Sequence, residues 1–448
     1  MTSQWIEAWL PVMLLVLCAL AARRWFATWL HPTAFVLAVW SVCIGLPLIA
    51  GPDFPVPPSG VWCMAALVLA IAMGSAVAAP QGAYDEPGTI TVGQTSRGLR
   101  IRYGWLRLMV LCVLACGIVY CVRLARMFGP TAIISIQLEA IAEKAHEASV
   151  DRYSDSPTEY DATTQVLSSA VYLGPAFAGI LFCVRRTRAD GILSWLALTP
   201  ALLSSLVSGT RAGIGWSVAL AAAFYLVSRV AFVRNDSPRR RLPRIILSVF
   251  GVLMMLELST ALDEVRVGRV PSFGISTATL SSARTRATFF GHVAVFSIWF
   301  DSNWKRLGSP TYGAYTLAGP LNWLRLRTRK SGLFEEPVVL LRDGTSSNIY
   351  TVFRALIEDY SMSGALVALW SVGVLGGCCY RGLKAGRHRR GAVLAVWYAS
   401  CLFIPSSLFV YNSLILALIL AALGWYLTVR SPAEFGGLPM VSERQLSS

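Results

Sequence analysis

The chain has 448 residues, of which 55% are apolar and only 14% are charged. A soluble protein carries roughly 25% charged residues, so this composition excludes the disordered, fibrous and secreted soluble classes and indicates a membrane protein. The net charge of +15 would suggest a nucleic-acid partner in a soluble chain, but in a membrane protein it must first be divided between the two sides of the bilayer.

Apolar runs long enough to cross a hydrocarbon core of ~30 Å recur from one end of the chain to the other. The first run has no basic leader and continues directly into Arg23-Arg24, so no cleavable signal peptide is expected. We predict an all-α integral membrane protein with about eleven transmembrane helices. The predicted spans are 5–22, 34–50, 61–79, 106–122, 166–184, 192–207, 212–228, 245–262, 362–380, 392–410 and 412–429.

Basic residues in the connections between these runs predict the orientation of the chain, because Lys and Arg are retained preferentially in short cytoplasmic loops. They gather in every second connection, at 23–24, 97–107, 185–188, 229–244 and 381–390. This alternation predicts an outside N-terminus and a cytoplasmic C-terminus, an arrangement that requires an odd number of spans.

Two outside connections are long, and we expect both to belong to a single membrane domain over residues 1–448. The first, 123–165, is expected to carry a surface helix after Pro130, and its acidic residues favour a solubilising cap over a binding site. The second, 263–361, carries an excess of Arg and Lys. Such a surface suits an anionic ligand such as a lipid-linked phosphate, while nonspecific contact with anionic headgroups is the alternative.

The ten cysteines lie inside the predicted spans or at their ends, and neither long outside connection contains one. We therefore expect them to pack as small polarizable side chains and predict no disulfide framework. The four histidines are isolated in sequence, and no Asp-x-Asp or His-x-x-x-His pattern stands on the outside. Neither a metal nor a cofactor is predicted.

Three outside segments break the apolar pattern. The first, SGTR at 208–211, places Arg211 at the edge of the hydrophobic slab, where it either faces a polar cavity or snorkels from a simple turn. The second, 289–301, is too short to span the membrane and is expected to form an interfacial or re-entrant helix that carries His292.

The third segment, 345–353, contains hydroxyl, amide and aromatic side chains and is followed by Glu358-Asp359-Tyr360 just before a span. Asn, Asp and Tyr commonly hold sugars, because they match hydroxyl groups and stack on ring faces. An interfacial belt of tyrosine beside a solvated acid pair is the alternative.

Together these motifs resemble those of the Wzy-type O-antigen polymerases of bacteria, a family of oligosaccharide repeat-unit polymerases related more distantly to O-antigen ligases. The resemblance covers about half of the chain, from roughly residue 192 to residue 380, and depends on the order and common outside placement of the motifs. These are SGTR at 208–211, the aromatic Gly-His helix before 313–321, and NIYT at 348–351 with EDY at 358–360 and Gly364. The family commonly has Gly after the Asp of the last motif, whereas Tyr360 follows Asp359 here.

The resemblance implies a metal-independent, GT-C-like glycosyltransferase at the periplasmic face of the bacterial inner membrane. It would transfer a growing glycan from undecaprenyl pyrophosphate onto a newly flipped lipid-linked repeat unit, in the biosynthesis of lipopolysaccharide or a related surface polysaccharide. An O-antigen ligase is the alternative with the same chemistry. A transporter or flippase of lipid-linked oligosaccharide is less favoured, because the charges gather at span ends and no two related halves are visible.

The chemistry divides the candidate residues into three roles. A departing pyrophosphate gains negative charge and, without a metal, needs preorganised cations; the predicted pyrophosphate-binding residues are Arg211, Arg284 and Arg286. The attacking hydroxyl must lose its proton to a histidine or a carboxylate; the predicted catalytic residues are His292, Glu336 and Asp359. The predicted sugar-binding residues are Asn348, Tyr350 and Arg354. Expected partners are undecaprenyl-pyrophosphate-linked glycans, membrane lipid and a candidate chain-length regulator, with no nucleic acid.

Overall fold

The computed structural model describes residues 3–80, 99–127, 161–208, 211–232, 283–306, 309–327, 337–403, 409 and 412–430. Within these residues, seven helices are long and apolar enough to cross a membrane, which confirms the prediction of an all-α membrane protein. They are α1 (Ser3–Phe26), α2 (Pro32–Ala50), α3 (Pro58–Ala78), α4 (Tyr103–Met127), α7 (Ala162–Val184), α10 (Arg211–Phe232) and α15 (Val352–Lys384).

The remaining predicted spans take other forms. Two of them are shorter apolar helices, α16 (Arg390–Leu402) and α17 (Asn412–Thr428). The predicted span 192–207 is divided between α8 (Arg188–Leu196) and α9 (Thr199–Ser208). The predicted span 245–262 and the predicted surface helix after Pro130 lie outside the described residues.

The break between α8 and α9 follows from Pro200, which has no backbone N–H to donate to the carbonyl of Leu196. The hydroxyl of Thr199 donates to that carbonyl instead, at 2.8 Å. The chain turns at residues 197–198 and then continues as a helix. A single apolar run in the sequence is therefore two short helices in the structure.

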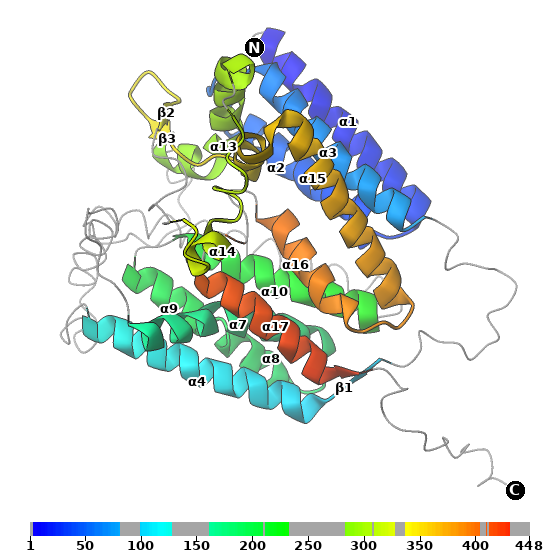
Figure 1. Cartoon of the computed structure of the whole chain (residues 1–448), viewed down its shortest axis with the longest axis vertical. Coiled ribbons are helices and arrows are strands. Elements are labelled where there is room, and N and C mark those ends of the chain that lie inside the picture. The colour runs from blue at the N-terminus through cyan, green and yellow to red at the C-terminus, as the bar shows by residue number, and fades with distance from the viewer. Residues whose placement is uncertain are drawn as a thin grey trace, which may run out of the picture.

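The helices form two groups (Figure 1). The first contains α1, α2, α3 and α15, and the second contains α4, α7, α8, α9, α10 and α17. Helix α16 lies between them and packs against both α10 and α15. Small residues bring the backbones close together within each group, as is common between membrane helices. A Cβ atom on Gly74 of α3 would lie 2.1 Å from the carbonyl oxygen of Trp370 of α15, and one on Gly179 of α7 would lie 2.1 Å from the carbonyl oxygen of Ala221 of α10.

One end of the bundle collects the basic connections. Strand β1 (Arg100–Ile101) pairs antiparallel with β4 (Val429–Arg430) there, and Arg107 forms an ion pair with Asp190 at 2.7 Å. His388, in the 381–390 connection, accepts a hydrogen bond through its carbonyl from Trp425 near the same strand. We call this the β1–β4 end. The sequence predicted that the basic connections share one side of a membrane, and the described residues of 97–107, 185–188 and 381–390 lie at this end.

The opposite end carries α13 (Ala283–Asn303), the one-turn 3-10 helix Trp304–Arg306, α14 (Ala318–Trp323) and an antiparallel hairpin of β2 (Val338–Val339) and β3 (Ser346–Ser347). Near its start α13 contacts the connection between α2 and α3, where Arg286 pairs with Asp53, and near its end Ser59 in the first turn of α3 donates to Asp301 at 2.7 Å. The helix therefore packs against the last turns of α2 and the first turn of α3. We call this the α13 end.

Candidate functional site

Segments that are far apart in the sequence meet at the α13 end. The β2–β3 hairpin rests directly on α13, because a Cβ atom on Gly291 would lie 3.0 Å from Leu340 and 3.5 Å from Ser347. The rings of Phe296 in α13 and Phe353 in α15 are 6.4 Å apart in an edge-on arrangement. The structure thus brings together two of the three polar segments that the sequence singled out, 289–301 and 345–353.

Arg354 lies at the centre of this junction, on the first turn of α15. Its guanidinium is 4.1 Å from the ring centre of Tyr350 and 5.2 Å from that of Trp299, within the range of cation–π contacts. Its Nε donates to Oε1 of Glu358, one helical turn further on, at 2.7 Å. The two charged side chains are 13% and 17% exposed, so both reach the surface, whereas the rings of Tyr350 and Trp299 are buried beneath them. The pair can therefore offer charged, hydrogen-bonding groups to a polar ligand.

Asp359, the next residue, is fully buried and anchors the neighbouring segment. Its carboxylate accepts hydrogen bonds from the hydroxyls of Thr311 and Thr316 and from the backbone N–H groups of Tyr315 and Thr316. A buried carboxylate that is so fully hydrogen-bonded stabilises a fold and has little capacity left to take a proton from a substrate. The geometry therefore favours a positioning role for Asp359 over the predicted catalytic one.

The segment that Asp359 holds connects the two groups of helices. At one end, the backbone N–H groups of Thr311 and Tyr312 donate to the carbonyls of Glu358 and Asp359. At the other, Gly319 of α14 donates to the carbonyl of Phe409 at 2.9 Å, next to the start of α17. Figure 1 shows α14 between the two groups. The site therefore lies where the two halves of the bundle are joined.

The helix α15 is interrupted directly after this anchor. Ser361 has φ 63° and ψ 174°, a conformation that is essentially reserved for glycine, and it separates a first helical segment from the long apolar one. The family motif that this segment resembles commonly has Gly directly after the Asp, a position that Tyr360 occupies here. In the structure, the glycine-like conformation lies one residue further on, at Ser361.

His292 has a structural explanation that depends on a proline in another helix. Pro47 lies inside α2 and has no N–H, so the carbonyl of Cys43 lacks its usual helical donor. Nε2 of His292 lies 3.2 Å from that carbonyl oxygen, and Nδ1 lies 3.2 Å from the carbonyl oxygen of Phe289. Both ring nitrogens of a buried side chain thus face backbone acceptors. This geometry argues against the predicted role of His292 as a catalytic base.

Arg286 is neutralised by an acid that the sequence did not connect to it. Its two terminal nitrogens bind the two carboxylate oxygens of Asp53 at 2.5 and 2.9 Å, and its guanidinium lies over the ring of Phe54. The Arg286 guanidinium also holds the pKa of Asp53 below its ordinary value. A bidentate pair of this kind joins α13 to the 51–57 connection, so the structure does not favour the predicted pyrophosphate contact.

The other predicted residues divide as follows. Arg354 lies in the junction, and Asn348 is exposed beside it, between β3 and α15. Tyr350 is buried in the junction, which argues against its predicted role as a sugar contact. Arg211 begins α10, and the ring of Trp216 in the same helix stacks on that of Phe403 at the end of α16. The side chains of Arg211 and Arg284, and the whole of Glu336, lie outside the described residues.

Sequence reasoning named Glu358 but assigned it no role. Its spacing of four residues from Arg354 favours an ion pair on a helix, but the sequence pattern predicted no helix directly before the span 362–380. Trp299 and Tyr315 carried no comparable signal, since their neighbours come from other segments. Burial, and then the negative charge of Glu358, raise the pKa of the Tyr315 phenol. The acidic side chain thus influences the segment that Asp359 holds in place.

Comparisons with known proteins return no match, whether to a family model, a curated protein or a solved structure. The functional argument therefore depends on the residues of this chain.

Proposed function

We propose that this protein is a polymerase of oligosaccharide repeat units linked to undecaprenyl pyrophosphate, a GT-C-like glycosyltransferase of the Wzy type in the bacterial inner membrane. The observation that carries the proposal is the meeting of 289–301, 345–353 and 309–317 around Arg354 and Glu358, at the end opposite the basic connections. If the basic connections face the cytoplasm, as their composition predicts, the junction faces the periplasm, where flipped repeat units are presented.

The reaction requires a base and cations from the protein. An acceptor hydroxyl attacks the anomeric carbon of the donor, the bond from that carbon to the pyrophosphate oxygen breaks, and the electron pair leaves with the pyrophosphate. The hydroxyl proton must pass to a base, and the charge that develops on the pyrophosphate must meet cations.

We assign the base to Glu358 in place of Asp359 and His292. Arg354 contacts one oxygen of Glu358 and orients the carboxylate. Burial raises the pKa of this carboxyl and the Arg354 contact only partly opposes the rise, which suits a group that takes up a proton. The buried rings of Tyr350 and Trp299 pack against the guanidinium of Arg354 and hold it in place. In this assignment Arg354 is a positioning residue and, as predicted from the sequence, a sugar contact.

The pyrophosphate remains assigned to Arg211 and Arg284. Both stand at the start of helices, α10 and α13, where positive partial charge at the helix terminus adds to that of the side chain. Arg286 does not belong to the proposal, because Asp53 takes both of its terminal nitrogens.

Gel analysis of surface polysaccharide with and without the gene tests the function. The deletion strain should carry glycan that ends after a single repeat unit, and the plasmid-borne gene should restore the ladder of longer chains. An unchanged ladder would contradict the proposal. Long chains that accumulate on undecaprenyl pyrophosphate without reaching lipid A would indicate a ligase instead.

A further inference from the structure

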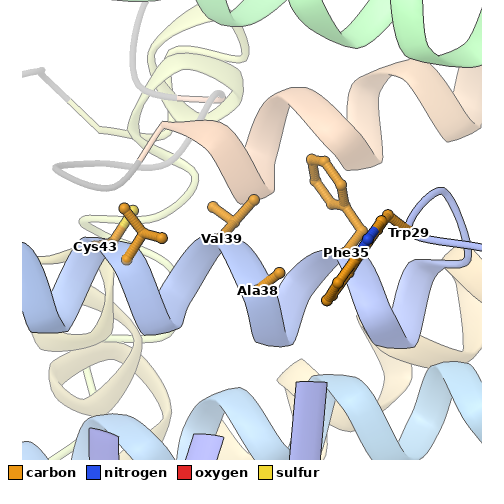
Figure 2. A pocket seen from close by; sticks show the side chains of 6 residues that line it. Trp29, Phe35, Ala38, Val39 and Cys43 are labelled. Atoms are coloured by element: carbon orange, nitrogen blue, oxygen red, sulfur yellow. The ribbon is translucent and has the colours of Figure 1, made fainter. Parts of the chain in front are cut away.

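A groove runs along α2 on the side of the first group of helices. It has a volume of about 390 Å³, and its lining is entirely apolar: Trp29, Phe35, Ala38, Val39, Val42 and Cys43. Figure 2 shows the side chains of Phe35, Val39 and Cys43 in a row on α2, on the side that faces α16. The row follows from their spacing of four residues, which places side chains on one face of a helix.

The groove opens sideways toward the surrounding membrane. Its inner wall reaches α16, since the ring of Phe35 packs edge-on against Tyr398 at 4.7 Å. Val42, on its outer side, is 61% exposed. From Phe35 to Cys43 the helix rises about 12 Å. This length is close to the depth of one leaflet, which is about half of a ~30 Å hydrocarbon core.

A cation stands at one mouth of the groove. Trp29 lies in the turn between α1 and α2, at the β1–β4 end, and the guanidinium of Arg23 lies 5.9 Å from its ring centre. Arg24 follows directly, so the last turn of α1 is basic. An exposed tryptophan beside arginines is the arrangement that membrane proteins use at the level of lipid headgroups.

We propose that this groove binds one acyl chain of an anionic phospholipid from the leaflet at the β1–β4 end, with the lipid phosphate at Arg23. The apolar lining and its length, close to the depth of one leaflet, match an acyl chain. The cation at the mouth of the groove matches the anionic headgroup. A lipid-linked glycan would place its pyrophosphate at the α13 end under the proposed function, whereas the cation here lies at the other end. The inference is thus independent of the enzymatic proposal.

Photolabelling tests the site. The purified full-length protein is reconstituted in vesicles that contain phosphatidylglycerol or phosphatidylcholine carrying a diazirine near the end of one acyl chain. After illumination, the labelled peptides are identified by mass spectrometry. Phosphatidylglycerol should label the peptide containing residues 35–43 more strongly than it labels the lipid-facing residues Leu111 and Val119 of α4, which serve as the internal control.

Two variants separate the parts of the proposal. Val39→Trp should fill the groove and reduce labelling of 35–43 to the level of the α4 control. Arg23→Gln should leave the groove open but lower the preference for phosphatidylglycerol over phosphatidylcholine by about fivefold, the effect of one cation at a membrane surface. Leu111→Trp, on the exposed face of α4, is the matched control for the added ring.

Thermal unfolding of each variant in detergent shows whether it is folded. Labelling of 35–43 that does not exceed the α4 control in the wild-type protein would overturn the proposal, whether the cause is an empty groove or another part of the chain lying over it. Equal labelling by the two lipids, or an unchanged preference in Arg23→Gln, would overturn the headgroup assignment.

Discussion

Two arginine–carboxylate pairs at the α13 end differ in what surrounds them. Arg286 binds both oxygens of Asp53 with two nitrogens, and this pair fastens α13 to the connection between α2 and α3. Arg354 contacts one oxygen of Glu358, and this pair lies among Tyr350 and Trp299 beside a segment that joins the two groups of helices. The first pair ties two distant segments of the chain together, whereas the second joins two residues of one helix, next to the segment that connects the two groups of helices.

The difference shows that an arginine in the right loop is a weak indication of a binding site. Both arginines belong to the same basic connection, 263–361, which is predicted to lie outside, and the sequence alone ranked Arg286 with the pyrophosphate contacts. The role of each arginine depends on which carboxylate it pairs with and where that carboxylate lies. The same distinction separates Glu358 from Asp359, which are adjacent in sequence but face different surroundings.

The largest expected effect on stability comes from Asp359→Ala. This change leaves the donors on Thr311, Tyr315 and Thr316 without their buried acceptor, and we expect it to lower the free energy of unfolding by about 3–5 kcal/mol. Denaturant unfolding in detergent measures the loss. Asp343→Ala, at an exposed turn, is the control and should cost less than about 1 kcal/mol. A stable but inactive Asp359→Ala would return the catalytic role to Asp359.

A smaller effect tests the explanation of His292. His292→Leu removes the donor to the Cys43 carbonyl and should cost about 1–3 kcal/mol. Pro47→Ala supplies that carbonyl with a backbone N–H from its own helix, so His292→Leu should cost less in the Pro47→Ala background. A double-mutant cycle measures this coupling, which we expect to be about 1 kcal/mol. Additive effects would show that the proline and the histidine are unrelated.

The smallest expected effect on stability concerns the ion pair between Arg286 and Asp53. Because Arg286 lowers the pKa of Asp53, the stability that this pair contributes is present above the ordinary carboxyl pKa and is lost as the pH falls through the lowered value. Asp53 is 42% exposed, so the contribution should stay below about 1 kcal/mol. The difference in unfolding free energy between the wild-type protein and Asp53→Asn should be constant above about pH 5 and shrink below about pH 4. A difference that persists unchanged at low pH would show that charge is not its source.

Properties that depend on composition and local pattern could be predicted from the sequence. Apolar runs indicated the membrane class, and each long helix overlaps a predicted span and extends beyond it. The outside placement of 289–301 and 345–353 was sufficient to expect that they share a site, and the structure brings them together at Gly291 and Ser347.

Properties that depend on distant partners could not be predicted. Asp53 and Arg286 are 233 residues apart, and His292 and Cys43 are 249 apart, so no local pattern connects them. Pro200 was evident in the sequence, but the continuous apolar run around it led to the prediction of one span where the structure has the two helices α8 and α9. The roles of neighbouring carboxylates depend on burial, which separates Glu358 from Asp359 only in three dimensions.

The central claim is that Glu358 acts on the substrate while Asp53 only supports the fold. Polymerisation of purified undecaprenyl-pyrophosphate-linked repeat units by the reconstituted protein tests it, with Glu358→Gln and Asp53→Asn as a matched pair of isosteric changes. We predict that Glu358→Gln lowers the rate by about 100-fold or more at unchanged stability, and that Asp53→Asn keeps it within about threefold of the wild type. A Glu358→Gln enzyme with the wild-type rate, or two variants that are equally impaired, would contradict the account.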